Sequence, residues 1–295
     1  MKKNILLPAA VTVAIALCTV SCGVKDPIYN TEHPDHGTIT LTTDWRAIDK
    51  NIKVPESYTV KADGFSATLS GVTNMLDYLF DPGSCHLRVY NTPEHIAIDE
   101  ATATVAQASG NADGAGQFVQ EMPGWLFTST QDVKIEADTD HAFTATMQQQ
   151  VRQLTLLIEP TGGTAGEIEH IEGYLSGAAA TLDFDKGEHG TPLNVELSFT
   201  KVTSGDNVGK WAATVRLLGI AGSRQELHAL IVFTDGSLKP LSLSSDLSAE
   251  LATFNADKAT PLTLGGTVVE TPTDVGFGAT ITDWVPVIGG PVIAK

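Results

Sequence analysis

The chain has 295 residues, of which 42% are hydrophobic, and 18 basic against 35 acidic side chains give it a formal net charge of −17. This charge, with no cluster of lysines or arginines after the first three residues, argues against nucleic acid as a partner and against adsorption to anionic lipid. The length is sufficient for two domains of common size.

The first 21 residues have the composition of an export signal. Met1, Lys2 and Lys3 form a short basic region, and the uncharged run ILLPAAVTVAIAL follows at residues 5–17. This run is shorter than the about 20 apolar residues that a transmembrane helix needs, and it has the length of a signal-peptide core. We expect residues 1–21 to be removed, which leaves 16 basic against 35 acidic side chains and a net charge of −19.

Two cysteines follow the apolar run, and the surroundings of Cys22 resemble a bacterial lipobox. The small residue Ser21 precedes Cys22, although Thr19 replaces the usual aliphatic residue, and Leu17 is too bulky for a cut before Cys18. The resemblance implies cleavage before Cys22 and lipidation of that cysteine; the alternative is an ordinary secreted protein. Three acyl chains exceed the single chain that binds a membrane only marginally, so this anchor would be permanent.

Residues 22–36 are expected to form a tether. The stretch GVKDPIYNTEHPDH at residues 23–36 is polar, contains two prolines and shows no periodicity. Fully extended, these residues would span about 45 to 50 Å. His33 and His36 could share a metal ion, but a mobile tether offers no preorganised site, so we expect neither a metal nor a cofactor.

Alternation with a period of two dominates from residue 37 onward and predicts an all-β fold of half-buried strands. The predicted strands are GTITLTTDW from Gly37, SYTVKADGFSATLSG from Ser57, CHLRVYN from Cys85, RQLTLLIEP from Arg152, WAATVRLLG from Trp211, LHALIVFTDG from Leu227 and FGATITDW from Phe277. One helix is predicted at residues 244–257, capped by Ser245 or Asp246 and with Leu247, Leu251 and Phe254 on one stripe. Residues 71–80 are expected to contain one further helical turn.

Two tripeptide motifs recur between the two halves of the chain. Leu-Ser-Gly stands at residues 69–71 and 175–177, and Thr-Asp-Trp stands at residues 43–45 and 282–284. Together with the similar order of strands, this predicts two similar β-sandwich domains, at residues 37–147 and 148–295.

Candidate catalytic groups are few, and we expect no enzyme. Cys85 is the only cysteine besides Cys18 and Cys22, and it stands beside His86. Neighbours in a strand point to opposite faces, which predicts a buried thiol and a surface imidazole instead of a nucleophile and its base. Glu167 and Glu169 would lie on one strand face like a glycosidase pair, but no apolar pocket is evident to raise one pKa, so a solvated face is expected.

The four tryptophans allow two interpretations. Trp45, Trp125, Trp211 and Trp284 could form a platform that stacks on sugars. Aromatic residues are only 6% of the chain, and two of these tryptophans end predicted strands, so the interpretation we favour is that they fill the ends of the cores.

These features together resemble the fimbrillin-like and fimbrium-anchoring subunits of donor-strand (type V) pili. The resemblance rests on the lipoprotein start at Cys22, the words HGTITLTTDW, MQQQVRQLTLLIEP, IEGYLSGAAATLDF and LIVFTDG, and a closing strand near Trp284. It implies tandem transthyretin-like Greek-key β-sandwiches, anchored by lipid and displayed on the outer membrane as part of a fimbrium. It also implies that the partners are other fimbrial subunits, bound by β-strand addition.

The resemblance leaves the role within the fimbrium open. In stalk subunits a protease cuts after an arginine and removes the first strand, whereas anchor subunits keep their lipid and that strand. Arg46 is the only arginine in the first 87 residues, and a cut there would release GTITLTTDW; an exposed turn arginine is the interpretation we favour. The closing residues WVPVIGGPVIAK could offer a strand to a partner or merely end the last strand. The rival class is a surface lipoprotein that binds a glycan or another host ligand.

Overall fold

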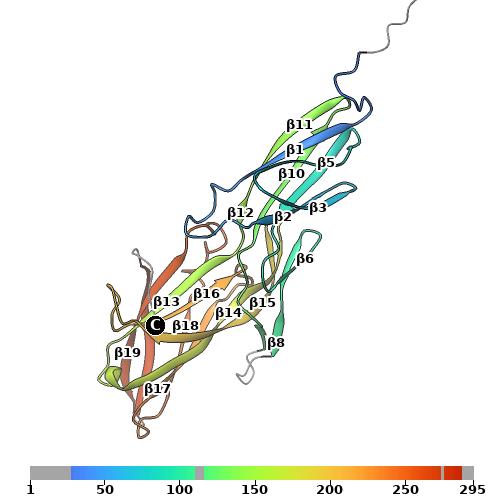
Figure 1. Cartoon of the computed structure of the whole chain (residues 1–295). Coiled ribbons are helices and arrows are strands. Elements are labelled where there is room, and N and C mark those ends of the chain that lie inside the picture. Colours follow the sequence, from blue (N-terminus) through green and yellow to red (C-terminus); the bar gives the residue numbers. More distant parts are fainter. Residues whose placement is uncertain (1–27, 110–115, 274–275, 288–295) are drawn as a thin grey trace, which may run out of the picture.

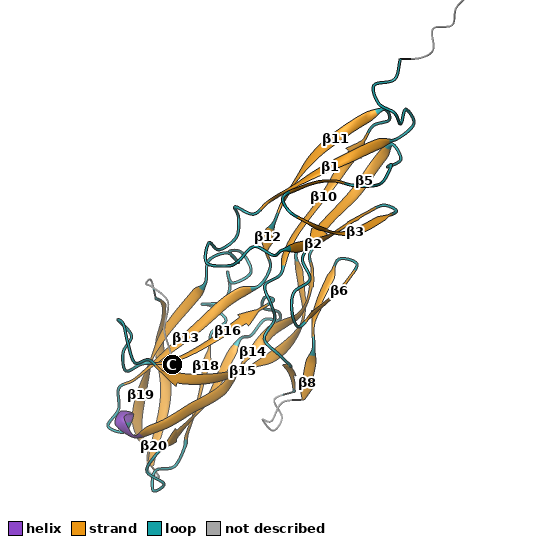
Figure 2. Cartoon of the chain, viewed as in Figure 1, coloured by secondary structure: helices purple, strands orange, loops and turns teal. Residues whose placement is uncertain are grey.

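The computed structural model describes residues 28–109, 116–273 and 276–287, and the regular structure in these residues is almost entirely β-strand. The exception is one turn of 3-10 helix, η1 (Ala165–Glu167), and no helix in the described part is long and apolar enough to cross a membrane. The strands form two groups along an elongated molecule, the N-terminal ones at one end and the C-terminal ones at the other (Figures 1 and 2). The all-β prediction is confirmed.

The N-terminal half contains two sheets packed on one core. The smaller sheet has the order β11-β1-β4, with β1 (Gly37–Asp44) between β4 (Thr73–Met75) and β11 (Thr139–Thr146). The larger sheet has the order β12-β10-β5-β2-β3, and its strands are β2 (Ser57–Ala62), β3 (Phe65–Ser70), β5 (Gly83–Tyr90), β10 (Phe127–Ile135) and β12 (Gln148–Gln149). Their inward side chains form a single apolar cluster, as expected for a β-sandwich.

The C-terminal half is built on one large curved sheet. Its main path runs β18-β17-β14-β15-β16-β13-β19-β20. The strands are β13 (Arg152–Pro160), β14 (Ile168–Asp183), β15 (Glu188–Lys201), β16 (Trp211–Leu217), β17 (Glu226–Phe233), β18 (Leu241–Asp246), β19 (Leu262–Thr273) and β20 (Gly276–Pro286). The sheet curls until its two end strands meet, where Trp284 Nε1 donates a hydrogen bond to Ser245 Oγ at 2.8 Å. All eight strands contribute to the apolar core on the inner side.

Two short hairpins cross from the N-terminal half onto this large sheet. They consist of β6 (Ile96–Asp99) with β7 (Thr102–Val105) and β8 (Gln107–Ser109) with β9 (Gln117–Val119). β7 pairs with β14, and β9 pairs with β15. A separate apolar cluster at this junction draws on both halves, for example Tyr90 and Leu182. The division into domains at residue 147 stays a prediction.

A polar cluster also joins the two halves. The Nδ1 atom of His86 lies 2.6 Å from Asp132 Oδ1 within the N-terminal half, and its Nε2 atom lies 3.2 Å from Asp185 Oδ2, which follows β14. The Arg88 guanidinium donates to the same Asp185 oxygen at 2.6 and 2.8 Å. The hydrogen bond with Asp132 is the main cause of a raised His86 pKa. This cluster therefore fixes the turn after β14 against the outer face of β5.

The predicted helix at residues 244–257 is wrong. Residues up to Asp246 continue β18 and pair with β17, and the residues that follow form consecutive turns. Only one i to i−4 hydrogen bond forms there, from Leu251 N–H to Leu247 O at 3.0 Å. The segment left after the strand is too short for a helix to be stable by itself.

Two features of that prediction hold despite the missing helix. Asp246 caps the first turn by accepting a hydrogen bond from the Ser248 N–H at 2.9 Å. The stripe of Leu247, Leu251 and Phe254 is fully buried in the C-terminal core. The apolar spacing therefore predicted which side chains are buried but not the backbone that buries them.

The helical turn expected at residues 71–80 is wrong as well, because β4 forms there and pairs with β1. The seven predicted strand segments are confirmed. The second of them is the β2–β3 hairpin, whose turn contains Gly64 at φ 75° with the Tyr78 hydroxyl where a Cβ would lie. Only glycine fits both conditions.

Candidate functional site

The first strand is an internal part of the N-terminal sandwich. β1 runs parallel to β11 over its whole length and antiparallel to β4 at residues 40–42. Its side chains alternate as the sequence predicts, and Ile39 and Leu41 are both 0% exposed. Removing this strand would leave two rows of unpaired backbone groups and an open apolar core, the arrangement that accepts an added strand.

Arg46 lies in the turn directly after β1. Its side chain is 90% exposed, and its guanidinium donates to both carboxylate oxygens of Asp44, at 2.9 Å from Nε and 2.6 Å from Nη2. The hydrogen bond from Arg46 lowers the pKa of Asp44 to about 2. Arg46 is thus an exposed turn arginine, and whether a protease cuts after it stays a prediction.

The residues just before β1 are bound to the body of the protein. The N–H groups of Asn30 and Thr31 each donate to the Asp138 carboxylate at 2.7 Å, in the turn between β10 and β11. His33 pairs with Asp140, and His36 lies 3.5 Å from Asp81. The two histidines therefore interact with different carboxylates. Cys18 and Cys22 lie outside the described residues.

The two end strands of the large sheet lie beside each other without a backbone ladder in the described ranges. β18 pairs with β17 alone and β20 with β19 alone, and no ladder joins β18 to β20 among the described residues. The inward side chains of β18, Leu241 and Leu243, are buried, while Ser242 and Ser244 point outward. The outer edge of β18 therefore faces β20 without a backbone ladder in the described part of the chain.

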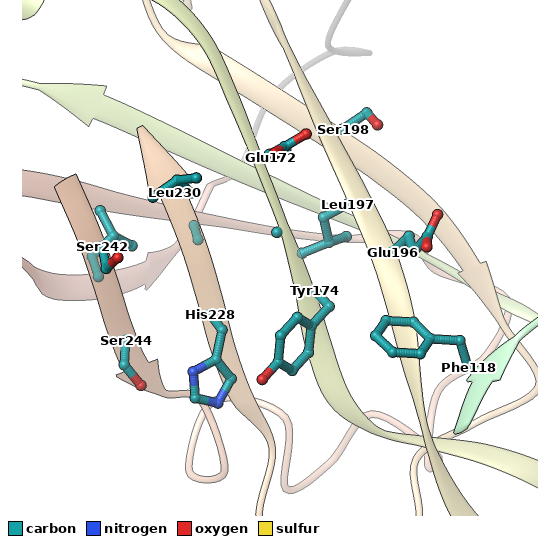
Figure 3. Close-up of a pocket in the computed structure, with 13 residues that line it drawn as sticks. Phe118, Glu172, Tyr174, Glu196, Leu197, Ser198, His228, Leu230, Ser242 and Ser244 are labelled. Atoms are coloured by element: carbon teal, nitrogen blue, oxygen red, sulfur yellow. The ribbon is translucent and has the colours of Figure 1, made fainter. Parts of the chain in front are cut away.

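A groove of about 640 Å³ lies on the outer face of the large sheet. Three rings from neighbouring strands follow one another along it, Phe118 from β9, Tyr174 from β14 and His228 from β17 (Figure 3). The Tyr174 and His228 rings stack with centroids 4.7 Å apart, and Phe118 meets Tyr174 edge to face at 5.6 Å. Phe118 is almost completely buried, which makes it one wall of the groove.

A second row of side chains runs beside the rings. Glu172 on β14 lies directly opposite Ser198 on β15 and Leu230 on β17 in the ladder. Between the two rows, Gly173 allows β14 to approach β17 closely, since a Cβ there would lie 2.0 Å from the His228 carbonyl oxygen. The outward positions of adjacent strands are thereby drawn together into one shallow depression.

No catalytic arrangement forms around Cys85. The thiol points into the N-terminal core and is 4% exposed, while His86 points the other way toward its carboxylates. Burial raises the pKa of Cys85. The predicted buried thiol beside a surface imidazole is confirmed.

We expect the Cys85 thiol to react with a thiol reagent only when the N-terminal sandwich opens, because a buried, protonated thiol is a poor nucleophile. Labelling with a maleimide, followed by intact mass, should proceed at least about a hundredfold more slowly in buffer than in denaturant, as expected when exposure requires opening. Fast labelling of the folded protein would contradict the position of this side chain.

The predicted position of the Glu167 and Glu169 pair is wrong in one respect. Glu167 belongs to η1 and not to a strand, and its carboxylate accepts a hydrogen bond from the Thr234 hydroxyl at 3.0 Å. Glu169 is the second residue of β14, and both side chains are exposed. The expected solvated surface is therefore present, but the two carboxylates do not share one strand face.

The tryptophans do not form a platform. Trp211 is buried in the C-terminal core, and Trp284 packs against the same core. Trp45 packs against the N-terminal core with its ring edge to face with Phe127, and Trp125 lies beneath the Arg216 guanidinium. The interpretation that these side chains fill cores is confirmed.

His189, at the start of β15, is half-buried, and its Nε2 atom is buried without a hydrogen-bond partner among the described residues. Burial, with a smaller effect of the nearby Lys258 charge, lowers its pKa to about 4. Because the folded-state pKa lies below that of the unfolded chain, the neutral imidazole stabilises the fold above about pH 6.5. This contribution is lost as the pH falls toward about 4.

We therefore expect the wild-type protein to unfold at lower urea concentration near pH 5 than near pH 7.5, and a His189→Gln variant to lose less over the same interval. The measurement is the urea midpoint at each pH. His86, whose raised pKa acts in the opposite direction, is unchanged in both proteins and cancels in the comparison. Equal pH dependence of the two proteins would exclude His189 as the cause.

The groove residues were not found from the sequence. Tyr174 and His228 stand at alternate positions of ordinary strands, 54 residues apart, and nothing local marks them. Only the register between β14 and β17, which places them side by side, reveals the pair.

Comparison with known proteins identifies the chain's relatives. A family model described as fimbrillin-A associated anchor proteins Mfa1 and Mfa2 matches residues 49–288. Among curated proteins, no match to the sequence was found.

Solved structures with the same fold are similar over most of the chain. The fimbrial anchor protein Mfa2 from Porphyromonas gingivalis is 14% identical, with a TM-score of 0.57, over 88% of this chain and 100% of that one. A candidate adhesin from Bacteroides ovatus is 12% identical, with a TM-score of 0.60, over 88% and 95% of the two chains. A second candidate adhesin, from Bacteroides ovatus ATCC 8483, is 17% identical, with a TM-score of 0.58, over 82% and 92%. At these identities the likeness shows the fold.

Proposed function

Because the chain belongs to the family of fimbrillin-A associated anchor proteins, we propose that it is an anchor or accessory subunit of a fimbrium. The family match over residues 49–288 is the observation that carries this proposal. In the proposed role the protein is not an enzyme: it holds other subunits and is itself held at the outer membrane. Its partners are those subunits and the lipid of the membrane.

The membrane attachment is proposed to be the lipidated Cys22. The hydrogen bonds of Asn30 and Thr31 to Asp138 support a short connection, because they fix the chain eight residues after Cys22. Eight extended residues span at most about 28 Å. The N-terminal sandwich would then stand close to the membrane, with the C-terminal half pointing away from it.

Attachment to other subunits is proposed to occur by β-strand addition. In the proposed anchor role β1 is kept, and a subunit that keeps its first strand has no open groove there for a neighbour. We place this addition at the outer edge of β18, which has no backbone ladder in the described residues; β20, whose Trp284 bonds Ser245, would have to move aside to admit a partner strand.

The test is intact mass and N-terminal sequencing of the protein from native outer membranes, together with two matched variants. We expect a mature chain that begins at lipidated Cys22, loss of membrane attachment in Cys22→Ser, and no change in Cys18→Ser. Cells with Cys22→Ser should shed their fimbriae into the medium. A mature start at Ala47 would overturn the anchor role in favour of a polymerising subunit. Unchanged fimbriae in a deletion strain would overturn any fimbrial role, as anchor or as polymerising subunit.

A further inference from the structure

We propose that the groove on the outer face of the large sheet binds a neutral glycan, one or two sugar rings at a time. This inference is independent of the fimbrial role, because a subunit could assemble through its strand edge whether or not the groove is occupied. The groove uses the outward side chains of β14, β15, β17 and β18, whereas strand addition would use the backbone edge of β18.

The size and composition of the groove are those of a small-molecule site. Its volume of about 640 Å³ lies within the range of about 300–1,000 Å³ in which proteins bind small ligands. Tyr174, His228 and Leu230, backed by the almost completely buried Phe118, supply apolar surface on which the C–H groups of a sugar ring can pack. Polar groups lie along one side of the row of rings, Glu172 and Ser198, and at its β18 end, Ser242 and Ser244 (Figure 3).

Those polar groups are unpaired within the described part of the chain. The carboxylates of Glu172 and Glu196 form no hydrogen bond or ion pair there, and neither do the hydroxyls of Ser198, Ser242 and Ser244. Some other carboxylates at the surface do pair with a neighbouring cation, as Asp44 does with Arg46 and Asp183 with Lys186. The groove therefore presents a set of hydrogen-bonding groups that remain free for a ligand.

The mixture of donors and acceptors selects the ligand class. Carboxylates only accept hydrogen bonds, whereas serine and tyrosine hydroxyls both donate and accept. A sugar hydroxyl also donates and accepts, so a glycan can satisfy both kinds of group. An ammonium group only donates, so it can pair with the carboxylates but offers the groove no acceptor of its own.

The charge of the groove excludes acidic ligands. Glu172 and Glu196 line it, and no lysine or arginine is among its lining residues in the described ranges. A sulfated or sialylated glycan would bring a negative charge beside two carboxylates with no cation to compensate. The site is thus expected to discriminate a neutral glycan from its acidic derivative.

The test is titration of the purified full-length mature protein, followed by NMR or calorimetry, with neutral disaccharides of glucose, galactose, mannose and N-acetylglucosamine. Lactose and sialyllactose form the matched pair for charge. The variants are Glu172→Gln with Glu196→Gln, which keep the shape of the groove, and Tyr174→Ala, which removes its central ring. Glu188→Gln, an exposed change outside the groove, is the control variant.

We expect at least one neutral disaccharide to bind below about 10 mM, and lactose, if it is that ligand, to bind more tightly than sialyllactose. The double glutamine variant and Tyr174→Ala should each weaken binding about tenfold or more, as expected when hydrogen bonds to charged groups or a central ring contact are lost, and Glu188→Gln should not. The glutamine pair keeps the test valid if Tyr174→Ala does not fold. Absence of binding by every neutral disaccharide, binding unaffected by both groove variants, or preferential binding of an oligolysine peptide would each overturn the proposal.

Discussion

A variant that begins at Ala47, and so lacks β1, is expected to have an unfolded or fluctuating N-terminal half, whereas a variant that begins at Gly37 is expected to fold. The shorter variant loses Ile39 and Leu41, which are fully buried between the two sheets. Truncating one such side chain costs about 2–5 kcal/mol, and the ladders to β4 and β11 are lost in addition. The sum is comparable to the about 5–15 kcal/mol by which a whole domain is stable.

Thermal unfolding by circular dichroism and hydrogen exchange of the β11 amides would measure this loss. A synthetic peptide of residues 37–46 should restore protection of β11, because the vacated position has the register of the native strand. Leu41→Ala in the intact chain, with Thr40→Ala as its half-exposed neighbour, gives the point-mutation version of the experiment. If the variant starting at Ala47 melts at the same temperature as the one starting at Gly37, β1 is not an integral part of the fold.

The period-two pattern was sufficient to predict the strands, because burial of one sheet face acts on each strand separately. In β17, for example, Leu227, Ala229 and Ile231 point inward and alternate with His228 and Leu230. This alternation is a local property of the sequence. The strands could therefore be located without knowledge of their partners.

The sequence-based predictions are wrong where pairing with a distant strand determines the structure. Residues 244–246 stand at the start of the predicted helix, yet they continue β18 and pair with β17. The β6–β9 hairpins lie within the sequence of the N-terminal half and still pair with the C-terminal sheet. Neither outcome is encoded in local periodicity, since the competing hydrogen bonds come from residues far along the chain.

The candidate groove was missed for the same reason. Its rings come from three strands, and the register between those strands sets which outward side chains become neighbours. The tryptophans, which were the obvious candidates from the sequence, pack in or against the cores, because burial of a large apolar side chain contributes most to the free energy of folding. The side chains that line the groove stand at ordinary outward positions of their strands.

Replacement of the buried Arg152 is expected to lower the free energy of unfolding by about 3–5 kcal/mol in Arg152→Ala. Arg152 is 7% exposed and begins β13, directly after the chain leaves the N-terminal half. Its guanidinium donates to the Phe254 carbonyl at 2.9 Å and to the Thr260 carbonyl at 2.7 Å, and it lies 5.0 Å above the Phe254 ring. The variant would leave two backbone acceptors and a ring without their cation.

The effect should reach beyond β13, because the same turns bind the connection between the halves. Gln149 donates to the Lys258 carbonyl at 2.7 Å, and the Lys258 ammonium donates to Gln150 at 2.7 Å. Urea unfolding would measure the loss, and hydrogen exchange of residues 247–260 would locate it. Arg216→Ala is the matched control, since Arg216 also lies over a ring, that of Trp125, but donates no hydrogen bond to a carbonyl in the described part of the chain. Equal losses in the two variants would mean that the contact with the ring, and not the hydrogen bonds to the Phe254 and Thr260 carbonyls, accounts for the stability that Arg152 provides.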